Sequence, residues 1–182
     1  MPQQQTEKKE SKKKWLLLLL LLLLITVASV AVTVTLLMQK PTVQAPDFAP
    51  QTVDENADKM DDDQDDKMEA QEGGGAISLT YSTQVTVDMG DGQARVLFQN
   101  PTRSTQDVVL QLVVGEGDQE TLVAQSQLIP AGYSLDVMEL EQPVLLTQGG
   151  YEGEFRVLCY DPDSGEKAVV NTVIPVDIMV QA

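Results

Sequence analysis

The sequence of 182 residues contains no histidine, a single cysteine and only eight aromatic residues: one tryptophan, four tyrosines and three phenylalanines. The absence of histidine excludes Ser-His-Asp and Cys-His catalytic sets and imidazole metal ligands. A single cysteine also excludes an internal disulfide bond and a Cys-x-x-Cys metal or redox motif. We therefore expect a protein that is not an enzyme and that uses no cofactor.

Basic residues are scarce as well, since 12 of them stand against 28 acidic residues, for a formal net charge of −16. Nucleic-acid phosphates repel such a chain, so we expect no nucleic-acid partner. Residues 1–14 contain five lysines and two glutamates, and residues 15–38 contain no charge. Residues 39–75 contain eleven acids and three lysines, and residues 76–182 contain fifteen acids and four basic residues. These segments predict a basic cytoplasmic tail, a transmembrane helix, an acidic disordered linker and an extracytoplasmic domain.

The uncharged run at 15–38 is 24 residues long. As a helix it would measure about 36 Å, enough to cross a hydrocarbon core of about 30 Å. Lysines precede it and acids follow it, so the positive-inside rule places the N-terminus in the cytoplasm and the C-terminus outside the cell membrane. The alternative is a secretory signal cleaved near Ser29 and Ala31, which would release a secreted β-sandwich. Because the run continues past Ala31, the sequence favours a single-pass anchor with membrane lipid as its partner.

Residues 39–75 contain three prolines near their start, an acidic run and a Gly73–Gly75 hinge. Proline favours extended backbone, and the acids repel one another and have little apolar surface to bury. The segment therefore predicts a solvated spacer. An alternative is a calcium loop with ligands at the spacing of Asp61, Asp63, Asp65 and Glu72, but Asp66 stands where such a loop requires glycine.

Strand periodicity and turn signals run through residues 76–182. The expected strands are 77–89 (with a break near Ser82), 93–99, 107–114, 121–128, 134–140, 151–160 and 168–180. Alternation within two of them defines a core face, which comprises Tyr151, Gly153, Phe155, Val157, Cys159, Val108, Leu110, Leu112 and Val114. Cys159 is thus expected to be a buried thiol. The size and spacing predict an all-β, immunoglobulin-like sandwich of about seven strands.

The stretch LIPAGYSLDVMELEQPVLLTQGGYEGEFRV, residues 128–157, resembles the second half of immunoglobulin-like extracytoplasmic modules of bacterial membrane-anchored surface proteins. The resemblance covers about 30 residues and implies that Tyr151 stands at the position of the tyrosine corner. The sequence departs from antibody domains, because Gly153 occupies the place of the second disulfide cysteine. No activity follows from this resemblance.

In an immunoglobulin-like strand order, the strands at 107–114 and 151–160 are neighbours. Their outward residues then include Val109, Val113, Leu158 and Tyr160, which predict an exposed apolar patch for a protein partner or for self-association. The alternatives are scattered surface residues and cover by the ends of the chain.

Two sets of acidic residues in the same region are further candidates. Asp161, Asp163 and Glu166 lie in one predicted hairpin loop and are weak calcium candidates, against the alternative of turn chemistry. Glu152 and Glu154 share an outward strand face, where we expect solvated rather than catalytic carboxylates.

Together these observations predict a membrane-anchored extracytoplasmic module that presents a β-sandwich to a protein partner at the cell envelope. The alternative is a calcium-assisted carbohydrate-binding adhesin, which is disfavoured because few aromatic residues are present to stack on sugars.

Overall fold

The computed structural model describes residues 15–27, 29, 43, 45–61, 66–70, 74–115, 120–141, 146–169 and 171–182. The chain divides into two compact units, Met1–Lys40 and Pro41–Ala182.

In the first unit, residues 15–27 and 29 are helical. They belong to the predicted transmembrane segment 15–38, of which residues 28 and 30–38 lie outside the described residues, as does the basic tail 1–14. Within the described part of the chain, no helix combines the length and the apolar character needed to cross a membrane.

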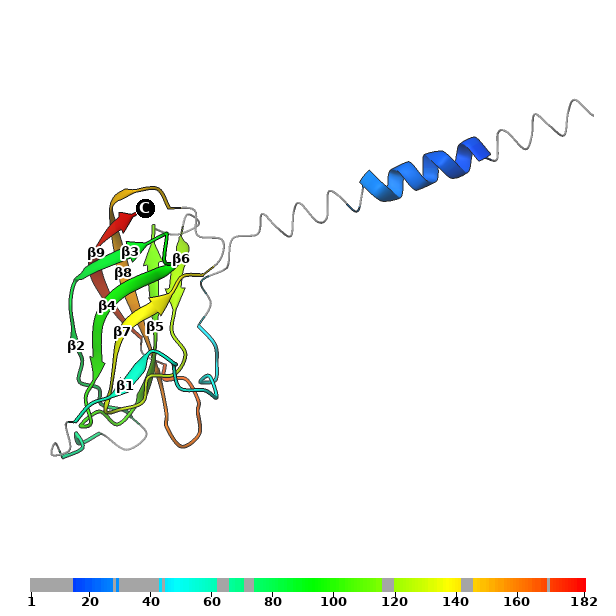
Figure 1. Ribbon diagram of the computed structural model, residues 1–182. Coiled ribbons are helices and arrows are strands. Elements are labelled where there is room, and N and C mark those ends of the chain that lie inside the picture. The colour runs from blue at the N-terminus through cyan, green and yellow to red at the C-terminus, as the bar shows by residue number, and fades with distance from the viewer. Residues whose placement is uncertain are drawn as a thin grey trace, which may run out of the picture. The chain divides into compact units, whose positions relative to one another are not determined.

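The second unit is built mainly of β-strands (Figure 1). They are β1 (Ala57–Lys59), β2 (Thr80–Tyr81), β3 (Gln84–Asp88), β4 (Gln93–Asn100), β5 (Asp107–Val114), β6 (Thr121–Gln125), β7 (Tyr133–Glu139), β8 (Gly149–Tyr160) and β9 (Thr172–Gln181). The prediction of an all-β domain is confirmed. Each predicted stretch overlaps at least one observed strand, and the predicted break near Ser82 falls between β2 and β3. β1 was not predicted.

The strands form one curled sheet in the order β1-β7-β4-β3-β9-β8-β5-β6, and β2 also pairs with β4. Only the β3–β9 pair is parallel among the pairings of these described strands. The curl brings β6 onto the chain that follows β7, where Ala124 bridges Leu140 and the Glu141 amide donates to the Val123 carbonyl at 2.9 Å. This contact covers part of a sheet edge whose backbone groups would otherwise lack partners.

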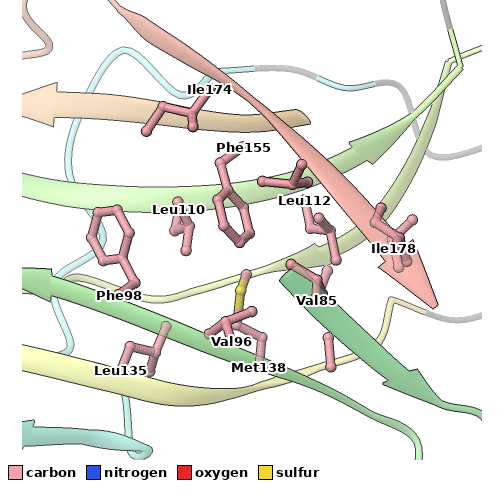
Figure 2. Packing of buried hydrophobic residues seen from close by; sticks show 14 of the residues in the cluster. Val85, Val96, Phe98, Leu110, Leu112, Leu135, Met138, Phe155, Ile174 and Ile178 are labelled. Carbon is pink, nitrogen blue, oxygen red and sulfur yellow. The ribbon is translucent and has the colours of Figure 1, made fainter. Parts of the chain in front are cut away.

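The inner face of the curled sheet holds the hydrophobic core. In Figure 2, side chains from β4 and β7, such as Phe98 and Leu135, face Leu110 of β5 and Phe155 of β8, and all four are fully buried. The predicted core face is confirmed: Phe155, Val157, Cys159, Val108, Leu110 and Leu112 are buried, and Tyr151 and Val114 pack against the cluster. Strict alternation in β5 and β8 therefore identified the inward side chains correctly.

Pro175 lies within β9 opposite Glu154 of β8. The amide of Asp177 donates to Thr83 on the β3 side, so the proline nitrogen two positions earlier faces the same side. Pairing with β3 starts only at Asp177, so the missing N–H of Pro175 leaves no acceptor unpaired in the sheet.

Residues 45–61, here called the strap, pack on the domain although they fall within the predicted disordered linker 39–75. The amide of Ala49 donates to the carbonyl of Gly165 at 2.8 Å, and the amide of Lys167 donates to the carbonyl of Asp47 at 3.0 Å. Farther along, Val53 forms a parallel bridge with Leu128, and β1 pairs with β7. The linker prediction is therefore wrong for residues 45–61.

The strap folds despite its prolines and acids because its backbone, more than its side chains, makes the contacts. Strands at the edges of the sheet have unpaired N–H and C=O groups, and the strap satisfies several of them. The other linker residues at 39–42, 44, 62–65 and 71–73 lie outside the described residues, as do Asp63, Asp65 and Glu72 of the alternative calcium loop.

Candidate interaction face

The predicted apolar patch does not face water. Val109 and Tyr160 are 0% exposed and Leu158 is 1% exposed, and the three form a small cluster with the half-buried Ala45, Ala49 and Leu128. The Tyr160 hydroxyl donates to the carbonyl of Pro46 at 3.0 Å. The prediction of an exposed patch is wrong because the strap, from earlier in the same chain, covers these side chains.

Val113, the fourth residue of that predicted patch, is also fully buried. Arg156 of β8 donates from both terminal nitrogens to Glu120 at 3.0 and 2.6 Å, and from Nε to Glu154 at 2.6 Å. Since β5 lies between β8 and β6, the Arg156–Glu120 pair crosses β5, where Val113 stands opposite Glu154. The hydrogen bond to Glu120 is the largest cause of the raised pKa of Arg156.

The calcium candidates form a turn. Asp161 Oδ1 accepts hydrogen bonds from the amide of Asp163 at 3.0 Å and from the amide and hydroxyl of Ser164 at 2.8 and 3.0 Å. These bonds lower the pKa of Asp161, and the bond from the Ser164 amide has the largest effect. Among the residues that the structure describes, no group of three or more Cys, Asp or Glu side chains is placed to hold a metal ion. Asp161, Asp163 and Glu166 are therefore not brought together as a ligand set.

Cys159 is buried as predicted, with 3% of its surface exposed. Burial raises the pKa of its thiol to about 11. A thiol with such a pKa carries little thiolate near neutrality, so this residue behaves as a small apolar side chain.

Asp54 is a buried carboxylate that the sequence did not single out. Its Oδ2 accepts the amide of Gln127 at 2.7 Å, and its Oδ1 accepts the amide of Asn56 at 2.9 Å. The carboxylate thus fixes the strap to the segment after β6 and also shapes the turn that leads into β1. The available signal was Asp followed by Asn two positions later, a pair that favours turns.

One exposed stretch of the outer sheet surface lies along β9, which pairs with β3 and β8. Val173 is 54% exposed and Met179 is 52% exposed, and Pro175 and Asp177 between them are exposed as well. Inward residues of β9 alternate with these and are buried. β9 therefore presents a mixed apolar and acidic stripe to solvent.

A hollow of about 250 Å³ lies on this stripe, between Gln84 of β3, Gly150 and Glu152 of β8, and Asp177 and Met179 of β9. Glu152 stands directly opposite Asp177 in the β8–β9 register, and Gly150 stands opposite Met179. Gln84 Nε2 donates to Asp177 Oδ2 at 3.0 Å. The hollow thus combines one apolar wall with two carboxylates.

Comparison with known proteins finds no matching family model and no matching curated protein. Among solved structures, the chain is similar to AggA, the major subunit of aggregative adherence fimbriae type I from Escherichia coli. The sequence identity is 10% and the TM-score is 0.32, and the match covers 59% of this chain and 95% of that chain. A similarity at this level assigns neither a family nor a function.

Proposed function

We propose that this chain is a single-pass membrane protein that presents its β-domain outside the cell, as a non-enzymatic module that binds a protein partner at the cell envelope. The observation that carries the proposal is the uncharged run at 15–38 behind five lysines. Lysines on the cytoplasmic flank retain the N-terminus, and the following chain crosses the membrane.

We further propose that the β-domain is immunoglobulin-like. The parallel pairing of β3 with β9, and the order β9-β8-β5-β6 on one side of it, support this arrangement. The hydroxyl of Tyr151 donates to the carbonyl of Thr147 at 2.9 Å and accepts from the Thr147 amide at 3.1 Å. A tyrosine at the start of a strand that bonds to backbone a few residues upstream is the feature of a tyrosine corner.

The strap changes the mechanism of presentation. If residues 15–38 span the bilayer, six residues, 39–44, connect them to the strap. A chain of that length reaches at most about 20 Å in any conformation. The proposed presentation therefore does not use residues 45–61 as part of a free acidic stalk.

The test is the topology of the full chain in cells, with one epitope tag at each terminus. Protease added to intact cells should remove the C-terminal tag and spare the N-terminal tag, and both tags should resist alkaline extraction from membranes. Replacing Leu20 and Leu24 with arginine should release the protein from membranes, at about 2.5–3.5 kcal/mol per arginine near the bilayer centre. A protected C-terminal tag in intact cells, or a mature chain that starts after Ala31, would contradict the anchor.

A further inference from the structure

The hollow on β9 is the size of one side chain. Its volume of about 250 Å³ lies below the range of about 300–1,000 Å³ that is typical of small-molecule pockets. Gly150 lines it without a side chain, and the space above this residue is open, because a Cβ added there would meet no atom within 4 Å. Met179, on the opposite strand, offers an apolar wall to a side chain lying in that space.

The charges around the hollow are unbalanced. Glu152 and Asp177 are both exposed and directly opposite each other, and like charges in that position destabilise a sheet. None of the ion pairs formed by the described residues involves either carboxylate. The nearest cation along β8, Arg156, is held by Glu120 and Glu154. An external cation would relieve the repulsion.

From this geometry we propose that the hollow binds an arginine or lysine side chain from a basic segment of the partner protein. The apolar stem of that side chain lies over Gly150 and against Met179, and its charged end meets Glu152 and Asp177. Long basic side chains commonly bury their stems while their charged ends form hydrogen bonds. The net charge of −11 on residues 76–182 attracts the same partner from a distance.

This inference deepens the proposed function and rests on it in one respect only, namely that the partner is a protein. It is tested by binding to the purified full chain in detergent, so its result does not depend on membrane topology. The probe is a fluorescent peptide of alternating arginine and valine, and the matched probe has glutamine in place of arginine. Binding is measured by fluorescence anisotropy at about 0.15 M salt, where charges separated by more than about 8 Å are screened.

Two variants carry the same change in net charge. E152Q/D177N neutralises the hollow, whereas D136N/E139Q neutralises two exposed acids on β7. We expect the first to weaken binding of the arginine peptide at least about fivefold and the second less than about twofold, because only the first removes its direct partners. A third variant, G150V, fills the hollow without changing charge, and it should weaken binding as much as the first.

Circular dichroism melts establish that each variant is folded before binding is compared. Equal losses in both acid variants would show diffuse electrostatic attraction and would overturn the proposal. The proposal would also be overturned if G150V bound the arginine peptide unchanged, if the glutamine peptide bound as well as the arginine peptide, or if no peptide bound. Calcium could also compete with the peptide for the same two carboxylates. That result would show that the hollow is a cation site, and it would overturn the proposal too.

Discussion

The hydroxyl of Tyr160 donates a hydrogen bond to the carbonyl of Pro46, which lies 114 positions earlier in the chain, at 3.0 Å. This bond joins the end of β8 to the start of the strap over an otherwise apolar cluster. It therefore holds the strap against the outer face of the sheet.

Replacing Tyr160 with phenylalanine tests this link. The ring and its packing remain, but the carbonyl of Pro46 loses its donor. We expect a loss of about 1 kcal/mol in the free energy of unfolding, measured by urea titration. Tyr81, which is 41% exposed, provides the control. Its change to phenylalanine should leave stability within about 0.5 kcal/mol, and an equal loss in both variants would contradict a specific role for Tyr160.

Removal of the strap is a stronger test of the domain boundary. A chain that starts at Asp62 should expose Val109, Leu158 and Tyr160, which a chain that starts at Pro41 keeps buried. Uncovering one side of three large apolar residues should cost roughly 2–5 kcal/mol. The shorter chain should bind a hydrophobic dye and unfold at lower urea concentration. Equal stability of the two chains would show that the strap is a dispensable cover.

The strands and the inward core could be predicted because period-two alternation records which side chains face inward. The prediction that the outer face of β5 is exposed is wrong, although the residues of this strand carry a signal of burial. Val108–Val114 is apolar at every position except Gln111, and a strand buried on both faces has such a continuous run. That pattern indicated cover on the outer face, but it could not show that the strap supplies the cover.

The hollow on β9 could not be predicted, because it depends on register. Glu152 and Asp177 are separated by 25 positions and become opposite only through the β8–β9 pairing. Gln84 reaches Asp177 only because β3 joins β9 in parallel. Sequence alternation shows which residues point outward, but it does not show which of them are neighbours across strands.

The buried thiol of Cys159 predicts a pH dependence. Its pKa is raised from about 9 to about 11, so the folded state disfavours the thiolate. The stabilisation that comes from keeping this thiol protonated is fully present below pH 9 and is lost as the pH rises through about 11. The total loss in the free energy of unfolding is about 2–3 kcal/mol for two pKa units. Urea titrations from pH 8 to pH 11 should show this loss, and Cys159→Ala should show a smaller slope. A thiol that reacts rapidly with a disulfide reagent at pH 8 in the folded state would contradict the burial.

Gly153 of β8 is required by close packing. A Cβ at this position would lie 2.7 Å from the carbonyl oxygen of Val113 on β5 and 2.5 Å from Cδ1 of Ile178 on β9. The isoleucine side chain can rotate away, but the backbone oxygen of β5 is held in the sheet, so Gly153→Ala should destabilise the domain by about 1–3 kcal/mol. Gly150→Ala is the matched control on the same strand, and its Cβ would meet nothing within 4 Å. Thermal and urea unfolding should separate the two variants clearly, and similar stability would show that β5 and β8 can move apart to admit a methyl group.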